Sequence, residues 1–545
     1  MIAVLKHKPL LLDIMASGAE ARLDTFDEAT GRFITEPTGP IAPGAKPEDL
    51  GWIVTNQDII YALATLFLEG PEHFRGKPEI LDIIGRAGDA IRDFQDEDGK
   101  VEFIKPDGSK WGMTYMGWTN YAWLEAWALM RDDAAFDEAR SARWEEGLTL
   151  AHDGQAKEIA DPDHVHNIPT WKAMSCWRAG ALMGRPDWQQ AAEDYMARCV
   201  ATQAPGGFWP EHGGPTTGYN RVYLHALGLY HIFSGDPSVL PAIEAATEFH
   251  QAFTYPDGSD IKVIDGRTKY SPSISVSALV AMTLTPRGRR YADYLLGLPR
   301  FPEAVQSPIG SHLASLYHHM QAGDEAAINL DESSFAKTYE DWAILTREGP
   351  WMGCLSAFVC PPTGSRWGQD RQQFLSLWHE DAGLVIGGGN SRNQPEWSSF
   401  VTSGRYIPDA GAIADGGVAL DYADNRCRIA LRFEGEAAVI EAAIESGSAV
   451  NHLTLPLKAG ERVTCASGLS ATTGDESVRW DARQMGEWIE LSGFRMALPA
   501  GADFAWPSVP FNPYAIDGAA GHGSECAILS APVEGEPTLW RIARV

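Results

Sequence analysis

A short loop rich in aspartate and histidine stands before an apolar helical pattern. The stretch DPDHVHN spans residues 161–167, and IPTWKAM follows it. His164 and His166 can accept or donate protons, and the D-x-D-H-x-H order also offers enough ligands for a metal ion. The uncharged amide of Asn167 carries two N–H donors, which suits it to a carboxylate ligand. Its alternative role is to cap the helix that begins here, with Pro169 in the first turn; a helix N-terminus also attracts anions, so the two roles are compatible.

Two tyrosines follow a glycine-rich loop further along the chain. In WPEHGGPTTGYNRVYLHALG, residues 209–228, Tyr219 comes directly after the loop and Tyr223 one helical turn later. The i,i+4 spacing places both phenols on one helix face. A tyrosine can take up and release a proton in turn when nearby positive charge lowers its pKa. Either tyrosine could have this role, and we expect at least one of the two to be a core aromatic.

Charged side chains accompany the tyrosines. His212 and Glu211 precede the loop, and one of them is expected to line a cleft. Arg221 follows the first tyrosine on another part of the helix surface. Arg267 and Lys269, in the later loop DGRTKY, would bring local positive charge to an acidic ligand. The competing interpretation of that loop is a solvated turn.

Tryptophan is the compositional outlier, with 19 copies. Tryptophan stacks on the faces of sugar rings, but it also fills hydrophobic cores. The candidates for stacking are Trp111, Trp118, Trp123 and Trp209. We expect one or two of them to contact a ligand and the others to belong to the core.

Two kinds of pattern position these residues. From about residue 50 to 345, apolar residues recur at three- and four-residue spacing, with Gly, Pro and Asp in the connections; long Trp- and Gly-rich loops favour a ring of helical hairpins over a solenoid. From about residue 370, short alternating runs are typical of an antiparallel sandwich. We therefore expect an α+β multidomain protein, with an (α/α) toroid in residues 1–345 and a β-sandwich in residues 346–545.

Composition narrows the class of partner. A chain of 545 residues needs at least two domains, and its formal net charge of −29 argues against nucleic acid and anionic membranes as partners. An acidic ligand would have to be attracted locally. Seven scattered cysteines without CxxC spacing predict buried free thiols. The N-terminus does not resemble a signal peptide, so we expect a cytoplasmic protein, or a periplasmic one if a leader was removed; a homo-oligomer is left open.

Four stretches together resemble the heparinase II/III-like and alginate-lyase-like polysaccharide lyases. They are HVHNIPTWKAM (164–174), WPEHGGPTTGYNRVYLHALG (209–228), YPDGSDIKVIDGRTKYS (255–271) and WHEDAGLVIGGGNSRNQPEWSSF (378–400). The resemblance implies an incomplete toroid followed by a sandwich, and a lyase that cleaves a uronate-containing glycan by β-elimination without a cofactor. It also implies that the product carries a C4–C5 double bond. The chain departs from the family in that His166 precedes Asn167 instead of following it.

The resemblance assigns roles to the residues above. Asn167 would neutralise the uronate carboxylate, and His164, His166 and His212 are further catalytic candidates. Tyr223 or Tyr219 would act as acid and base; Tyr223 is favoured because it stands five residues before Gly228, as in the alginate-lyase pattern. The substrate-binding candidates are Glu211, Arg221, Arg267, Lys269, Trp118 and Trp209. Several members of the family bind a structural zinc ion near the start of the sandwich, which would here involve His379 and Asp381 with His452 as a third ligand.

Two alternatives remain open from the residues alone. A glycoside hydrolase needs two carboxyl groups across the scissile bond, and Glu211 with Asp161, Asp163 or Asp257 would be the pair. An exo-acting glucuronidase would be the clearest case. A carbohydrate-binding scaffold would use the same residues without turnover.

Overall fold

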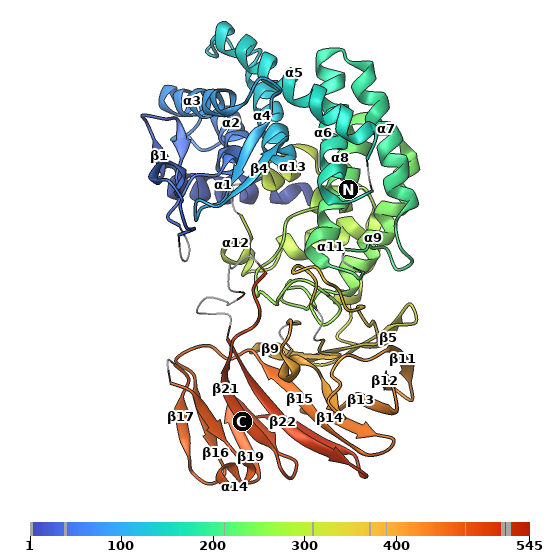
Figure 1. The fold of residues 1–545 in the computed structure, drawn as a ribbon. Coiled ribbons are helices and arrows are strands. Elements are labelled where there is room, and N and C mark those ends of the chain that lie inside the picture. The colour runs from blue at the N-terminus through green and yellow to red at the C-terminus, as the bar shows by residue number, and fades with distance from the viewer. Residues whose placement is uncertain are drawn as a thin grey trace. The chain divides into compact units, whose positions relative to one another are not determined.

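The computed structural model describes residues 4–37, 41–162, 164–211, 213–307, 310–369, 372–387, 390–474, 476–513, 518 and 525–545. The chain divides into two compact units. Unit 1 comprises residues 1–209, 219–248 and 274–327, and unit 2 comprises residues 210–218, 249–273 and 328–545. Figure 1 shows that unit 1 is built of helices and that unit 2 is built mainly of strands. The α+β class, a helical toroid followed by an antiparallel sandwich, is confirmed.

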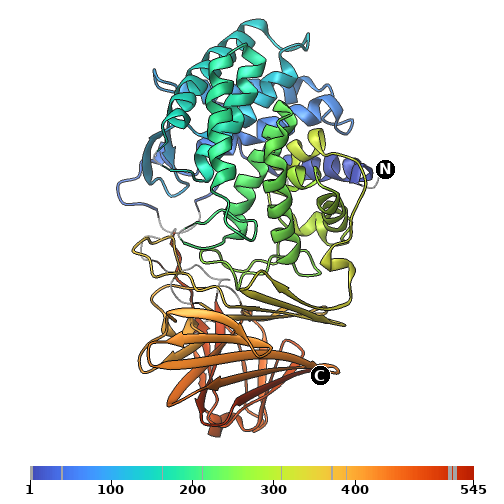
Figure 2. The ribbon, with the colours of Figure 1, turned by 90° about the vertical axis from the view of Figure 1, so that its right-hand side faces the viewer.

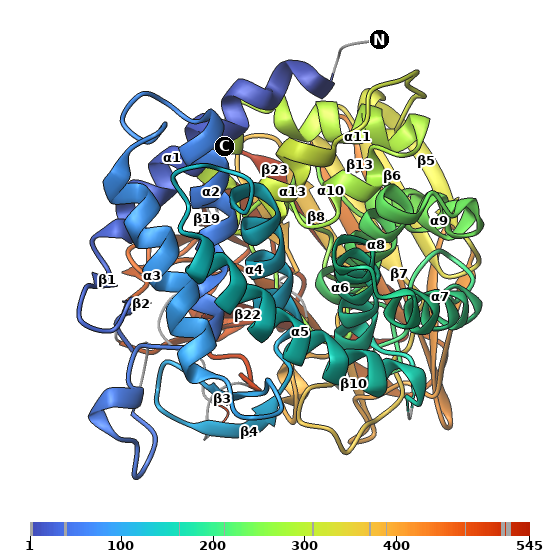
Figure 3. The same cartoon turned by 90° about the horizontal axis from the view of Figure 1, so that it is seen from above.

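The helices of unit 1 form two layers of an arc (Figure 3). The inner layer consists of α2 (Ile59–Glu69), α4 (Gly117–Met130), α6 (Asn167–Met183) and α8 (Thr217–Ser234). The outer layer consists of α3 (Pro78–Phe94), α5 (Glu138–Ala160), α7 (Pro186–Ala201) and α9 (Leu240–Ala252). Further helices are α1 (Lys8–Leu23), α10 (Leu279–Met282), α11 (Pro286–Leu296), α12 (Phe301–Ala304) and α13 (Ser311–His319). The short hairpins are β1 (Phe26–Asp27) with β2 (Arg32–Phe33), and β3 (Val101–Ile104) with β4 (Lys110–Thr114).

Burial distinguishes the two layers. The outer helix α3 buries only one stripe, with Ile80, Ile84, Ala87 and Ile91 at three- and four-residue spacing. The inner helix α2 is buried over nearly its whole length and on every side. A helix with one apolar stripe covers a surface, whereas a helix that is apolar all round lies between other elements. Figure 2 shows the helices running alongside one another.

Unit 2 contains three antiparallel sheets. Their strand orders are β5-β6-β7-β8-β9, β10-β15-β22-β21-β18 and β11-β12-β13-β14-β23-β20-β19-β16-β17. The strands of the first sheet are β5 (Ser334–Tyr339), β6 (Ala343–Glu348), β7 (Trp351–Ser356), β8 (Leu375–His379) and β9 (Gly383–Ile386). Those of the second are β10 (Phe400–Thr402), β15 (Ser448–Leu455), β18 (Val478–Trp480), β21 (Asp503–Ser508) and β22 (Cys526–Glu534). The third contains β11 (Ala410–Ala414), β12 (Gly417–Tyr422), β13 (Asn425–Glu434), β14 (Ala437–Ile444), β16 (Arg462–Cys465), β17 (Ser470–Thr472), β19 (Trp488–Leu491), β20 (Phe494–Ala497) and β23 (Thr538–Arg544).

Alternation builds the core of unit 2. Along β22, Ala527, Leu529, Ala531 and Val533 join one hydrophobic cluster, while Ser530 between them is only half-buried. Successive side chains of a strand point to opposite faces, so these four residues pack into the core from one face, while Ser530 lies on the other. All seven cysteines are buried free thiols, as predicted. A search of the described helices found none that combines the length and apolar character needed to cross a membrane.

Candidate active site

Helix α6 brings Asn167 to the end of unit 1. His166 occupies the N-cap position with extended backbone angles and no side-chain capping bond, and Asn167 is the first residue of the helix. The Thr170 hydroxyl donates to the His166 carbonyl oxygen at 2.8 Å, which closes the first turn. Asn167 is 6% exposed. The capping alternative therefore does not account for its side chain, because the residue before it occupies the cap.

Helix α8 holds the tyrosines, and two polar side chains organise its start. The Asn220 side-chain oxygen accepts from the Trp209 backbone N–H at 3.1 Å. Asp265 accepts from the backbone N–H of Thr217 at 2.9 Å and from its hydroxyl at 3.1 Å, so a carboxylate sits at the positive end of this helix. The side chain of Tyr219, two residues into the helix, is half-buried.

Tyr223 has a different environment from Tyr219. It is 1% exposed, and its ring stacks on Trp209 with centroids 5.1 Å apart and an interplanar angle of 10°. Trp209 is itself 1% exposed, and its ring nitrogen donates to the Cys199 carbonyl oxygen at 2.8 Å. Both rings are thus part of the packing between α7 and α8. Of the two tyrosines, only Tyr219 keeps part of its side chain accessible.

Two ring contacts fix the register of α6 against α8. Trp171 stacks on His225 at 4.9 Å between centroids, and Trp177 meets Tyr230 edge-on at 6.3 Å. The sequence offsets are 54 and 53 residues, so the helices run parallel and Asn167 lies level with residues 220–221. With a rise of about 1.5 Å per residue, Tyr219 is within about 3 Å of Asn167 along the helix direction. The two helix starts therefore share one end of the inner layer.

A third inner helix begins at the same level. Trp118, in the first turn of α4, is half-buried, and its ring lies 5.9 Å from the ring of Trp171. Since Trp171 is one turn beyond Asn167, Trp118 lies beside that turn. Trp123 is fully buried and Trp111 is half exposed on the β3–β4 hairpin. Trp118 is thus the tryptophan that combines partial exposure with proximity to the start of α6.

Two stacked histidines lie at the start of α6. The rings of His164 and His166 stack at 4.7 Å, and burial, with His164 and Lys172 nearby, lowers the pKa of His166 to about 4. His166 is therefore neutral near pH 7 and can accept or donate one hydrogen bond through each ring nitrogen without bringing charge. His212 lies outside the described residues.

Deeper in unit 1, a cluster of three rings was missed by sequence reasoning. Buried polar atoms without a hydrogen-bond partner among the described residues include Nε1 of Trp171, Nε2 of His225 and Nδ1 of His312. The Nδ1 of His225 accepts from the Ala278 N–H at 3.2 Å, so its proton is on Nε2. Such a group of unsatisfied atoms is suited to an internal water molecule. No sequence motif predicts this cluster, because its three residues come from α6, α8 and α13.

In unit 2, the remaining candidates lie on two loops. Arg267 forms an ion pair with Glu211 at 2.8 Å, and both side chains are largely buried. Lys269 donates to the Gln369 side-chain oxygen at 2.7 Å and to the Asn390 carbonyl, and burial lowers its pKa to about 7. Buried Lys262 contacts Asp260 at 3.1 Å and Asp265 at 3.7 Å. These cations are ordered by buried partners, so the loop is not a solvated turn.

Two carboxylates that a hydrolase would use, those of Glu211 and Asp257, are engaged in contacts within the protein. Glu211 is held by Arg267, and an oxygen of Asp257 accepts from the backbone and hydroxyl of Ser259 at 2.9 and 2.6 Å. Asp161 is exposed at the end of α5, and Asp163 lies outside the described residues. Geometry therefore supplies no argument for an acid–base pair of carboxylates.

The three suggested zinc ligands do not form one cluster, because His379 and Asp381 approach to 4.0 Å between Nδ1 and Oδ2 whereas His452 lies on a different sheet. His379 is buried, its Nδ1 accepts from the Asp381 N–H at 3.1 Å, and Asp381 also contacts Arg544 at 3.5 Å. His452 donates instead to the Ser398 carbonyl at 3.1 Å. Among the described residues, no group of three or more His, Cys, Asp or Glu side chains is placed to hold a metal ion. The contacts of His379 and Asp381 are those of a polar strand end.

Comparison with solved structures gives the fold a context. A chondroitinase AC lyase studied with oligosaccharides matches 99% of this chain and 82% of its own at 13% identity, with a TM-score of 0.50. The chondroitin AC lyase of Streptomyces coelicolor A3 matches 98% and 79% at 13% identity, with a TM-score of 0.50. A Paenibacillus xanthan lyase matches 98% of this chain and 56% of its own at 11% identity, with a TM-score of 0.51. The chain has the fold of these polysaccharide lyases.

Sequence comparison adds no closer relationship. No family model and no curated protein matches the chain. At 11–13% identity the likeness establishes the fold, and the chemistry must be argued from the residues of this chain. The architecture expected from the four short stretches is nevertheless the one observed.

Proposed function

We propose that the protein is a polysaccharide lyase that cleaves an acidic glycan by β-elimination at a uronate residue. The observation that carries the proposal is the shared level of two helix starts, with Asn167 opening α6 and the accessible Tyr219 opening α8. The lyase fold is consistent with it. The product would be an oligosaccharide with a C4–C5 unsaturated uronate at its new end.

The chemistry needs a neutraliser and a proton carrier. The C5 proton of a uronate is weakly acidic, and the ionised carboxylate beside it disfavours further negative charge in the transition state. The Asn167 amide, at the positive end of α6, would donate to that carboxylate and stabilise the enolate-like transition state. No cofactor is needed for these steps.

Tyr219 is the proposed acid and base. Its phenolate would take the C5 proton, and the phenol so formed would give that proton to the leaving oxygen on C4, so that one group serves both steps. Tyr219 is assigned this role in place of Tyr223, whose ring is packed against Trp209 and sealed from solvent. Arg221, two residues later and 2% exposed, is a source of positive charge that would favour the phenolate.

Neutral groups complete the site. Trp118 would support a sugar ring, because it is the accessible tryptophan beside the first turn of α6. His166 and His164 would hydrogen-bond to hydroxyl groups, and a neutral His166 avoids competing with Asn167 for the carboxylate. Such a site recognises the acid group mainly through uncharged donors, in keeping with the strongly acidic chain.

The test is a screen for the unsaturated product. Purified protein is incubated with alginate, rhamnose–glucuronate oligosaccharides and other uronate-containing glycans, and ultraviolet absorbance and new reducing ends are recorded together. The expected result is that both rise in proportion with at least one substrate. New reducing ends without ultraviolet absorbance would indicate hydrolysis and overturn the proposal.

A matched pair of variants ties turnover to the site. Asn167→Ala removes the neutralising amide and is expected to reduce turnover by 10²–10³-fold, the usual effect of losing one transition-state donor. Asn425→Ala, at the start of β13 in unit 2, removes an amide of the same kind and should leave turnover unchanged. Equal activity of the two variants would exclude Asn167 from the chemistry.

A further inference from the structure

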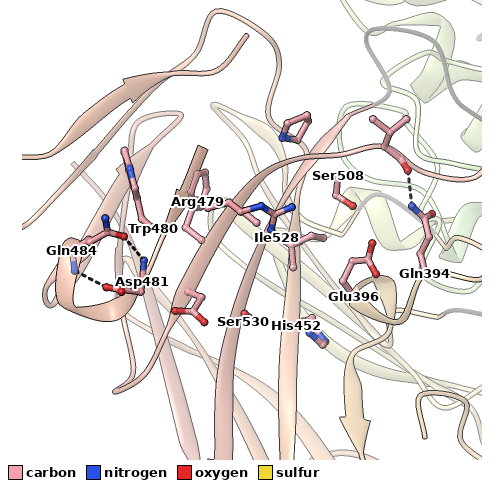
Figure 4. A pocket seen from close by; sticks show the side chains of 15 residues that line it. Gln394, Glu396, His452, Arg479, Trp480, Asp481, Gln484, Ser508, Ile528 and Ser530 are labelled. Atoms are coloured by element: carbon pink, nitrogen blue, oxygen red, sulfur yellow. Dashed lines mark hydrogen bonds between the residues drawn. The ribbon is translucent and has the colours of Figure 1, made fainter. Parts of the chain in front are cut away.

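Unit 2 contains a pocket of about 760 Å³ on one of its sheets. Its floor is formed by adjacent strands of the sheet β10-β15-β22-β21-β18, and Figure 4 shows the side chains that line it. Its volume is that of ordinary small-ligand sites. None of its lining residues belongs to the candidate active site of unit 1.

Strand register arranges the polar groups of the floor. His452 pairs with Ser530, and Ser530 pairs with Asp503, so these three lie in one row across β15, β22 and β21. Two residues further along, Ile528, Ala505 and Arg479 form a second row. Residues two apart in a strand share a face, so both rows face the pocket, while Leu529 and Phe504 between them join the core.

Two short segments beside this sheet face enclose the pocket. On one side the short 3-10 turn Pro395–Trp397 is tied to β21, because Trp397 donates to the Ser508 hydroxyl at 2.9 Å and Gln394 donates to the Val509 carbonyl at 2.7 Å. A β-bulge between Ala505 and Ser508 lets β21 bend at this point. On the other side Asp481 and Gln484 cap each other at the turn after β18.

Three of the four charged side chains that line the pocket are not used by the described part of the chain, the exception being Asp481. Glu396 on the wall, Asp503 on the floor and Arg479 on the edge strand form no ion pair or side-chain hydrogen bond within the described part of the chain. Figure 4 shows Glu396 and Arg479 approaching the floor from different elements. His452 donates from Nδ1 to the Ser398 carbonyl, so its Nε2 is an acceptor, and burial lowers its pKa to about 4.

This arrangement selects for one ligand chemistry. Carboxylates accept hydrogen bonds, and a guanidinium donates them, so Glu396, Asp503 and Arg479 together suit a group that does both. Vicinal hydroxyls of a sugar meet this requirement. An acidic sugar would be repelled by the carboxylates of Glu396, Asp481 and Asp503, whereas Arg479 only offsets part of their attraction for a cation, so a cationic probe belongs in the test. The described residues form no metal site here.

We propose that this pocket is a non-catalytic binding site for a neutral sugar residue. This proposal rests on the proposed function only in one respect: the neutral sugar would belong to the same glycan as the uronate cleaved in unit 1. The pocket would hold the substrate chain through a residue that the acidic surface does not repel, and so keep the polymer bound between cleavage events.

Binding of neutral disaccharides to the full-length protein tests the proposal. Saturation-transfer NMR and calorimetric titration are carried out with maltose, cellobiose, lactose and mannobiose, with glucuronate and spermidine as acidic and cationic probes. At least one neutral disaccharide is expected to bind, while neither charged probe displaces it. Absence of binding by all four, or binding of spermidine alone, would overturn the proposal.

Variants assign the binding to the pocket. Glu396→Gln and Asp503→Asn should each raise the dissociation constant about tenfold, because each removes a charged hydrogen-bond acceptor. Glu536→Gln, an exposed carboxylate on the β22–β23 turn, is the charge-matched control and should bind as the wild type does. Unchanged binding in the Glu396 and Asp503 variants would place the disaccharide elsewhere and refute the inference.

The lyase proposal and the sugar-binding proposal can be refuted independently of each other. Asn167→Ala should retain wild-type affinity for the neutral disaccharide even though its turnover is lost. Glu396→Gln should retain turnover on a short uronate oligosaccharide and lose efficiency only on long chains. A protein that binds neutral disaccharides in the pocket but yields no unsaturated product would keep the second proposal and lose the first.

Discussion

The helices of unit 1 and the sheets of unit 2 place buried polar side chains differently. Unit 1 buries an ion pair between the helix residues Glu125 and Arg178, with two contacts of 2.7 and 3.2 Å, and buries histidines from several helices. In unit 2 the buried ion pair of Arg267 with Glu211 lies on loops, and the sheets enclose a large core of apolar and aromatic residues. The inner helices of an arc face one another around a common centre, so polar groups enter the interior. Period-two alternation instead assigns each strand residue to core or solvent.

This contrast matters for function. Polar groups enclosed by helices have few alternative partners and little water, which strengthens their interactions and shifts their pKa values. That environment suits proton transfer. Polar groups on a sheet face that opens to solvent can exchange water for a ligand, which suits reversible binding. We therefore place chemistry in unit 1 and retention of the glycan in unit 2.

The largest effect should separate two neighbouring tyrosines of unit 1. Tyr219→Phe removes the proposed acid and base and is expected to lower kcat by about 10³–10⁴-fold. Tyr223→Phe removes only a buried hydroxyl next to Trp209 and should leave kcat within about fivefold of the wild type. Ultraviolet assays of the unsaturated product measure both, with circular dichroism as a check on folding. The reverse ranking would return the role to Tyr223.

Removing one partner of the buried ion pair should lower the free energy of unfolding of unit 1 more than removing one partner of an exposed pair lowers that of unit 2. Glu125→Ala leaves Arg178 without its partner and should cost about 3 kcal/mol in the free energy of unfolding. Asp409→Ala breaks an exposed pair with Arg405, 2.7 Å long, and should cost less than about 1 kcal/mol. Chemical denaturation followed by hydrogen exchange in each unit provides the comparison. Similar costs would mean that burial does not distinguish the units.

Acid should destabilise the helical unit first. Burial lowers the pKa of His152, His312, His318 and His319 to about 4, from an unfolded value near 6.5. Their neutral forms are favoured by folding, so this stability is complete above pH 6.5 and is lost as pH falls from 6.5 towards 4. Each contributes about 1–3 kcal/mol at the acid end of that range.

One group opposes this trend. Burial raises the pKa of Asp58 to about 7, so the protonated carboxyl is favoured by folding and its contribution is lost as pH rises from 3.8 towards 7. The four histidines outweigh one carboxyl. Hydrogen exchange between pH 7 and 5 should show protection falling in unit 1 before unit 2. Simultaneous loss in both units would contradict the expectation.

The smallest effect concerns sugar stacking. Trp118→Ala should raise KM for a uronate oligosaccharide two- to tenfold with little change in kcat, because one aromatic contact contributes about 0.5–1.5 kcal/mol. Trp111→Ala is the control, since Trp111 is exposed on the β3–β4 hairpin and contacts Lys105 at 3.8 Å. A larger change in KM for Trp111→Ala would move the sugar platform to the hairpin.

Sequence patterns recovered the layers of the fold because those depend on local periodicity. Three- and four-residue spacing identified the helices, and short alternating runs identified the strands. Asn167 and the two tyrosines were singled out because two short stretches resemble the lyase family, and both stretches lie at helix starts. The choice between Tyr219 and Tyr223 could not be made in this way, since i,i+4 residues are equivalent until a neighbouring element such as Trp209 covers one of them.

What the sequence determined by itself was the order of helices and strands, the excess of negative charge and the residue types available for chemistry. Tertiary structure decided which of these residues meet. It brought loop residues 210–218 and 249–273 into the strand unit, aligned Trp171 with His225, and arranged His452, Ser530 and Asp503 in one row. The physical reason is that helix and strand periods are encoded within a few residues, whereas these contacts join positions separated by tens of residues and depend on packing over the whole unit.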